Sequence, residues 1–175
     1  MKKILSLFIA CILCVTAITG TAFADTEASS NWYGVITDAD GNVVEVLTMT
    51  RTLYVDSIHT IPAGGSFVSY QYEPDESFIF GFLNHDENGR IITEYGRQVE
   101  LSVEMSNSIG GGGRDVFGPY TYSIYVNGDM GRFINPHKST YNYRYFNGKI
   151  INKSSLPTTI RIMIAVDQDS LPYNI

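Results

Sequence analysis

The sequence predicts an all-β protein, an antiparallel β-sandwich of the immunoglobulin-like or jelly-roll kind with about nine or ten short strands. Three observations lead to this prediction. Apolar and polar residues alternate with a period of two in several stretches, and turn sequences rich in glycine and asparagine recur between those stretches. No window shows the apolar spacing of three and four that marks an amphipathic helix. The 175 residues are enough for a domain with a packed core.

The clearest strand patterns lie at residues 97–105 and 158–167. The first has one apolar face, formed by Val99, Leu101, Val103 and Met105. The second has isoleucines at 160, 162 and 164 on one face, followed by Val166. Met163 and Ala165 make its other face partly apolar as well, so we expect this strand to lie centrally in its sheet.

Turn sequences divide the other predicted strands. Asp38–Asn42 is expected to join strands 32–37 and 43–55, Asp86–Gly89 to join 78–83 and 91–95, and Asn147-Gly148 to join 141–146 and 149–152. Glycine and asparagine reach positive φ at low cost, which hairpin loops require.

Three more stretches complete the predicted set. Residues 66–72 place Val68, Tyr70 and Tyr72 on one face, and residues 120–126 alternate in the same way. Residues 78–83 are apolar on both faces, so we expect a strand that is covered on both sides. The glycine-rich stretch 108–114 is the one flexible segment expected between two strands.

The first residues predict export. Lys2 and Lys3 are followed by an apolar run from Ile4 to Ile18, and Ala22-Phe23-Ala24 matches a signal-peptidase site. We therefore expect a bacterial signal peptide at residues 1–24 that is cleaved, leaving a single β-sandwich domain at 25–175. The mature protein would be secreted and extracellular, without a transmembrane segment. Both cysteines, Cys11 and Cys14, would be removed, so the mature chain would be cysteine-free and without disulfides.

Composition excludes two classes of protein. The chain has 12 Lys and Arg against 18 Asp and Glu, a net charge of −6, and only 17% charged residues. An acidic chain of this kind lacks the basic surface that nucleic-acid binding requires, so no nucleic-acid partner is expected. The charge fraction is also too low for a charge-rich disordered segment.

Catalytic signatures are largely missing. The three histidines, His59, His85 and His137, do not form a zinc motif, and the common serine-hydrolase and nucleotide-binding motifs are absent. Paired carboxylates far apart in sequence would still allow a secreted glycan-active hydrolase, because a glycosidase needs only two such groups across the bond. This hydrolase is kept as the first alternative function.

A weak calcium signal lies at Asp38, Asp40 and Asn42. These residues are spaced by two, as are the first ligands of a calcium loop, but the bidentate glutamate and the flanking helices of an EF-hand are absent. The same residues also suit an ordinary hairpin turn. No cofactor is expected other than calcium at this position.

Aromatic residues are the most informative feature of the composition, with 12 Tyr, 9 Phe and 1 Trp. Tyr141, Tyr143 and Tyr145 are predicted to share one face of a strand, with Arg144 opposite. An exposed ladder of this kind would bind a glycan or a cell-surface protein, since tyrosine offers contact area and a hydroxyl at low entropic cost. The same pattern is also typical of a half-buried strand whose aromatic face is core, and the pattern by itself favours this second interpretation.

A second alternative function is a membrane-acting toxin, for which residues 43–55 would supply one arm of an inserting hairpin. Arg51 would then face lipid, which is costly at the midplane of a bilayer. The function that the sequence favours is therefore a secreted, non-enzymatic binding or surface-interaction module, with Tyr141, Tyr143, Arg144 and Tyr145 as its candidate ligand-binding residues.

Overall fold

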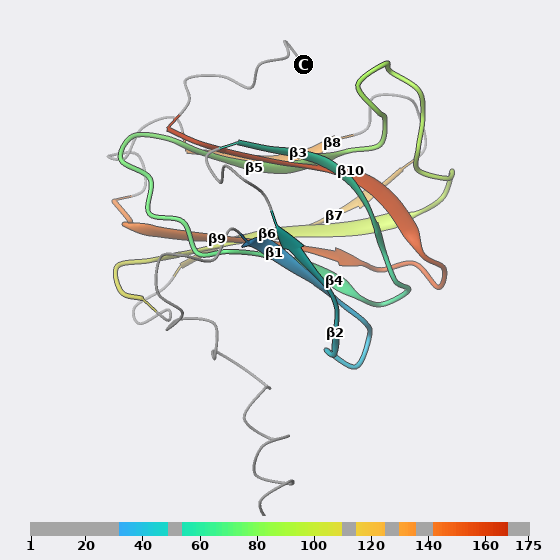
Figure 1. The fold of residues 1–175 in the computed structure, drawn as a ribbon, viewed down its shortest axis with the longest axis horizontal. Coiled ribbons are helices and arrows are strands. Elements are labelled where there is room, and N and C mark those ends of the chain that lie inside the picture. Colours follow the sequence, from blue (N-terminus) through green and yellow to red (C-terminus); the bar gives the residue numbers. More distant parts are fainter. Residues whose placement is uncertain (1–31, 49–53, 110–114, 125–129, 136–141, 168–175) are drawn as a thin grey trace, which may run out of the picture. The chain divides into compact units, whose positions relative to one another are not determined.

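In a computed structural model, the chain forms two antiparallel sheets that face each other (Figure 1). The structure describes residues 32–48, 54–109, 115–124, 130–135 and 142–167, and these residues contain ten strands and no helix. The predicted all-β sandwich is confirmed. The predicted signal peptide lies outside the described residues.

One sheet has six strands and the other has four. The strands of the larger sheet are β1 (Trp32–Thr37), β2 (Val43–Thr48), β4 (Ser66–Ser69), β6 (Gln98–Ser106), β7 (Asp115–Ser123) and β9 (Tyr145–Asn152). Those of the smaller sheet are β3 (Tyr54–Ile61), β5 (Phe78–Leu83), β8 (Met130–Asn135) and β10 (Thr158–Val166). Their orders are β2-β1-β4-β9-β6-β7 and β3-β10-β5-β8.

The core between the sheets is built largely from phenylalanine. Six phenylalanines are fully buried: Phe67, Phe78, Phe80, Phe82, Phe133 and Phe146. The near-parallel rings of Phe67 and Phe80 lie 6.1 Å apart, and those of Phe78 and Phe146 lie 5.2 Å apart, so aromatic packing joins the two sheets. Burial of each such side chain stabilises the fold by about 2 kcal/mol.

The strands with the strongest sequence patterns lie where they were expected. β6 buries the predicted face from Val99 to Met105, and β10 lies centrally between β3 and β5. β5 is buried on both faces, as its continuous apolar sequence predicts. On the outer side of the four-stranded sheet, a second buried cluster is formed by Ile79, Leu83, Met163 and Ala165.

An ion pair lies on this same outer face. Arg161 alternates along β10 with the core residues Ile160 and Ile162, and its guanidinium donates two hydrogen bonds to the Asp56 carboxylate on β3. Arg161 is buried. Removal of the aspartate would leave a buried charge without its bidentate acceptor, which is a much larger penalty than the loss of an exposed ion pair.

The predicted turn at Asn147-Gly148 is wrong, because β9 runs straight through these residues. A side chain at Gly148 would meet the ring of Phe80 on the opposite sheet at 2.4 Å. The glycine is therefore required for close packing between the sheets and not for a turn. The Asn147 side chain donates to the carbonyl oxygen of Ser69, which further holds β9 beside β4.

The single strand predicted at residues 43–55 is also wrong. β2 and β3 are separate strands that belong to different sheets, and residues 49–53 between them lie outside the described residues. Alternation continues across the junction, so periodicity alone cannot show where a chain passes from one sheet to the other.

Three smaller differences concern single segments. Residues 91–95 form no strand and make only one bridge, from Ile91 to His85. In β4, Phe67 and Ser69 face the core, whereas Val68 faces outward, because the larger phenylalanine takes the inner position. β7 begins at Asp115, earlier than the predicted start at residue 120.

We predict that Gly148→Ala destabilises the protein by about 2 kcal/mol, because the new methyl group overlaps the Phe80 ring. Urea unfolding of the single variant, of Phe80→Leu and of the double variant checks this. The methyl group should cost clearly less in the Phe80→Leu background, where the ring has been removed. An equal cost in both backgrounds would show that the contact with Phe80 is not the cause.

Candidate functional site

Two aromatic side chains at the edge of the core lie together where β1 begins and β4 ends. β1 and β4 are antiparallel neighbours, so Trp32 at the start of β1 comes beside Tyr70, which directly follows β4. Their rings pack edge to face with centroids 5.0 Å apart. The Tyr70 amide donates to the carbonyl oxygen of Tyr33 at 2.9 Å, which holds the Tyr70 backbone beside β1. Tyr70 is 37% exposed and Trp32 is half-buried.

A charged pair follows within three residues of Tyr70. Tyr72 and Phe146 form an antiparallel bridge with hydrogen bonds of 2.8 and 2.9 Å, which brings the chain against the start of β9. Glu73 then accepts a hydrogen bond from Arg144, and this bond raises the pKa of the guanidinium. Three residues span at most about 11 Å, which limits the distance between the Cα atoms of Tyr70 and Glu73.

These four residues, Trp32, Tyr70, Glu73 and Arg144, are called the Trp32 patch here. The side chains of Arg144 and Glu73 are 64% and 46% exposed, and the guanidinium lies 5.3 Å from the centroid of the Tyr145 ring. An ion pair this exposed contributes little to stability. Its polar atoms are therefore accessible to a ligand.

The four candidate residues from the sequence have different positions. Tyr141 lies outside the described residues. Tyr145 is buried at the start of β9, and Tyr143 is half-buried and packs against the core. Arg144 is the exposed one. Residues 142–144 form no strand, and Asn142 has a positive φ of 54°, so the prediction of a strand ladder is wrong there. Ligand binding by these residues stays a prediction.

Sequence reasoning missed Trp32, Tyr70 and Glu73 as members of one surface. Tyr70 was assigned to a strand face with Val68 and Tyr72, but the strand ends at Ser69, and Tyr70 is exposed whereas Tyr72 is buried. The one sequence feature that could have indicated this surface was the single tryptophan of the chain, Trp32, at the start of a predicted strand. Its pairing with Tyr70 depends on the contact between β1 and β4, which no local pattern reveals.

A second polar cluster lies between the two sheets. The Tyr33 hydroxyl on β1 lies 3.0 Å from Ser57 Oγ and 2.7 Å from His59 Nε2, both on β3, and the last two atoms are 2.9 Å apart. Serine beside a neutral imidazole is the arrangement of a nucleophile and its base. Here, however, Tyr33 and Ser57 compete for the same ring nitrogen. The geometry therefore serves mainly to join the edge of one sheet to the other.

Burial determines the electrostatics of this cluster. Burial is the main cause that raises the pKa of Tyr33, and it lowers the pKa of His59 from its usual value of 6.5. The negative charge of Glu45 on β2 has a smaller effect and acts to raise the pKa of both groups. Both side chains are therefore neutral at pH 7.

The predicted calcium residues form a hairpin turn between β1 and β2. Asp38 Oδ1 accepts hydrogen bonds from the amides of Asp40 and Asn42 at 3.0 and 2.8 Å, and Asn42 Nδ2 donates to Oδ2. These bonds lower the pKa of Asp38, with the Asn42 side chain as the largest cause. Asp86 accepts from the amides of Asn88 and Arg90 in the same way.

In both turns the carboxylate, Asp38 or Asp86, accepts hydrogen bonds from backbone amides of its own turn, and this role accounts for an aspartate at each position without a metal ion. Within the described ranges, no three His, Cys, Asp or Glu side chains lie close enough together to hold a metal. Calcium binding by Asp38, Asp40 and Asn42 stays a prediction that the structure does not test.

Membrane insertion was the second alternative function. No helix in the described part of the chain is long and apolar enough to cross a membrane. The inserting arm proposed at residues 43–55 is divided between two sheets, and Arg51 lies outside the described residues. The hairpin on which the toxin hypothesis depended is therefore not formed as predicted.

Comparison with known proteins shows only distant likeness. No family model matches the chain, and no curated protein matches it in sequence. A Clostridium thermocellum structure of the CBM22-1–GH10 modules of endo-1,4-beta-D-xylanase 10B, complexed with xylohexaose, aligns with a TM-score of 0.35 and 14% identity. The enzymatically active domain of tailspike protein 4 from bacteriophage CBA120 aligns with a TM-score of 0.34 and 14% identity.

These alignments cover 79% and 84% of this chain but only 25% and 20% of the xylanase and tailspike chains. The chain thus spans a quarter or less of the length of the structures that it matches. Likeness at this level does not identify a ligand or a reaction.

We predict that His59 makes the protein sensitive to acid. Because burial lowers the pKa of His59 in the folded state, the unfolded chain binds a proton at higher pH than the folded chain does. This contribution is present above the unfolded pKa and is lost as pH falls below about 6.5 towards the folded pKa. The free energy of unfolding of His59→Gln, measured in urea between about pH 7.5 and about pH 5, should fall less steeply than that of the native protein.

His85→Gln is the matched control, since His85 is also half-buried but bonds to Asn84 beside a turn. It shows what replacement of a half-buried histidine outside the Tyr33 cluster does to the same measurement. If His59→Gln and the native protein lose stability in parallel, His59 does not contribute to the acid sensitivity.

Proposed function

We propose that this protein is a secreted, non-enzymatic binding module whose ligand is a glycan held at the Trp32 patch. The observation that carries this proposal is the partly exposed Trp32–Tyr70 ring pair, with the exposed Glu73–Arg144 pair beginning three residues after Tyr70 in the chain. Sugar rings combine apolar C–H faces with hydroxyl groups. Aromatic rings bind the first, while carboxylate and guanidinium groups hydrogen-bond to the second.

The rigidity of the patch supports a binding role. The Tyr70 and Tyr72 rings pack edge to face 5.8 Å apart, and Tyr72 in turn lies 5.7 Å from the buried Phe78. The surface ring is thereby connected to the core through one continuous aromatic contact. Little side-chain entropy is lost when a preorganised ring of this kind binds a ligand.

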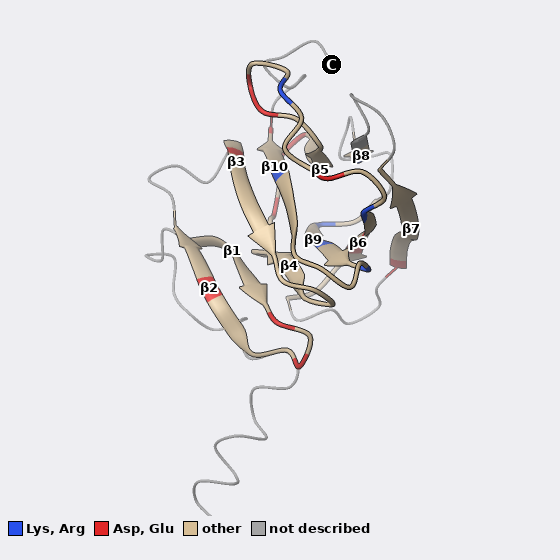
Figure 2. Cartoon of the chain, turned by 90° about the vertical axis from the view of Figure 1, so that its right-hand side faces the viewer, with Lys and Arg blue, Asp and Glu red and all other residues tan. Residues whose placement is uncertain are grey.

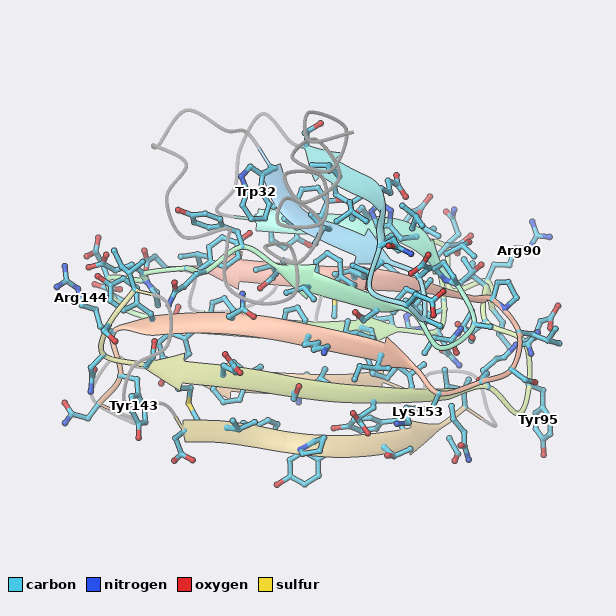
Figure 3. All side chains as sticks on the ribbon, turned by 90° about the horizontal axis from the view of Figure 1, so that it is seen from below. Trp32, Arg90, Tyr95, Tyr143, Arg144 and Lys153 are labelled. Carbon is cyan, nitrogen blue, oxygen red and sulfur yellow. The ribbon has the colours of Figure 1, made fainter. Side chains whose placement is uncertain are left out.

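The experiment measures binding of the protein to soluble polysaccharides by affinity electrophoresis and to a glycan array. Trp32→Ala and Tyr70→Ala should each weaken binding about tenfold or more, because each removes part of the aromatic surface. Tyr95→Ala is the matched control: Tyr95 is 78% exposed but lies at the opposite end of the sheets from Arg144 (Figure 3). It should bind as the native protein does.

Three outcomes separate the alternatives. Equal loss of binding in all three variants, or none in any, would contradict the assignment of the Trp32 patch. Turnover of a polysaccharide that is abolished by replacement of one carboxylate would instead support the glycan-active hydrolase. Binding to cell surfaces that survives complete removal of glycans would indicate a cell-surface protein as partner.

Secretion is a separate part of the proposal. The positive residues, apolar run and Ala22-Phe23-Ala24 site predict that the mature chain begins at Asp25. Expression of the full chain in a bacterial host, followed by N-terminal sequencing of protein from the medium, checks this. Protein that stays with the cells and keeps Met1 would contradict export.

A further inference from the structure

The four edge strands of the two sheets differ in how they discourage pairing with another chain. β7 contains Pro119, which removes a backbone donor, and its register with β6 is interrupted. β8 carries the exposed Arg132, and the charged residue of β3, Asp56, is paired with Arg161. Proline, charge and irregular register are the common devices that protect an edge.

β2 has little of this protection. Val43, Val44 and Val46 are 41%, 54% and 56% exposed, and Glu45 is the sole charged residue of the strand. Among the described residues, β1 is the only strand that pairs with β2. One side of β2 is therefore an exposed apolar edge, which is a template for strand addition.

The two faces of β2 differ in chemistry. On the outer face, Val46 is registered opposite Val35, which in turn lies opposite Val68 on β4, so a row of valines ends at the free edge. On the inner face, Glu45 is registered opposite the core residue Ile36. β3 is the edge strand of the four-stranded sheet, and its Ser57 and His59 bond to Tyr33 on β1. No strand of that sheet therefore covers β2, and Glu45 is exposed.

The charge of the β1–β2 hairpin, residues 32–48, is of one sign. It contains Asp38, Asp40 and Glu45 and no lysine or arginine. Figure 2 shows acidic residues in the turn and on β2, with no basic residue on this hairpin. A second copy of the same hairpin would bring the same three acids, whereas a basic strand would neutralise them.

We propose that the free edge of β2 binds an extended peptide segment of a partner protein in which aliphatic residues alternate with lysine or arginine. The segment adds an antiparallel strand to the six-stranded sheet. Its aliphatic residues continue the outer valine row opposite Val44 and Val46. Its basic residue lies opposite Glu45, on the inner face. Backbone hydrogen bonds supply affinity, and the two faces of β2 supply selectivity.

A short synthetic peptide that alternates valine and lysine is the probe. Titrated into isotopically labelled protein, it should shift the amide resonances of residues 43–48 and protect them from hydrogen exchange. The same peptide with N-methyl groups on alternate residues cannot donate along the edge and should not bind. This comparison leaves the protein unchanged, so its result does not depend on the folding of a variant.

Charge reversal tests the role of Glu45. Glu45→Lys should weaken binding of the valine–lysine peptide about fivefold and should strengthen binding of a valine–glutamate peptide by a similar factor. Glu87→Lys, which makes the same change of charge in the exposed Asp86–Gly89 turn, should leave both affinities unchanged.

Several results would overturn the proposal. Binding that the N-methylated peptide retains would be electrostatic attraction without strand addition. Shifts centred away from β2, or no binding of the valine–lysine peptide, would remove the site. Analytical ultracentrifugation would show whether a second copy of the chain occupies the edge instead. Dimers that form with rising concentration, and that Val46→Lys abolishes, would assign the edge to a second copy. Val116→Lys is the control, because Val116 lies on β7 and is 43% exposed, and it should leave such dimers intact.

Discussion

Close packing of phenylalanine against glycine is the constraint on which this sandwich depends. A side chain added at Gly34, Gly131 or Gly148 would meet the ring of Phe67, Phe82 or Phe80 at 2.3 to 2.5 Å. Two of these contacts join neighbouring strands of a sheet, and the Gly148–Phe80 contact joins the sheets themselves. The rings reach packing density only because the glycines let them approach the backbone. The core is therefore a set of matched pairs, in which the large residue and the small one depend on each other.

The two sheets differ in strand number, and a cluster of polar side chains lies at the side where the larger sheet extends past the smaller one. Because one sheet has six strands and the other four, β1 and β2 extend to and beyond the edge strand β3. Tyr33, Ser57 and His59 join the sheets at that edge with mutual hydrogen bonds, where water would otherwise reach the core. The start of β1 at Trp32 and the edge of β2 that no other described strand covers both lie on this side of the larger sheet.

Local patterns predicted those elements whose environment is the same along their whole length. β6 alternates cleanly because it has the core on one face throughout, β10 is apolar on both faces because both are buried, and the Asp38–Asn42 turn is defined by its own side-chain bonds. The predictions were wrong where the same residue type occurs in two different structural roles. Gly148 matched a turn but makes room for Phe80, and the tyrosines near β9 matched a ladder although the strand begins only at Tyr145.

The sequence by itself determined the all-β class, the main strand faces and the acidic composition, since these depend on local periodicity, turn chemistry and residue content, and it is the basis on which we propose export. Only the tertiary structure decided which residues share a surface. Trp32 and Tyr70 meet because β1 pairs with β4, and Glu73 meets Arg144 because Tyr72 bridges to β9. Such contacts join residues 38 to 71 positions apart. The pairing of strands sets them, and that pairing depends on how the whole core is filled and not on any local pattern.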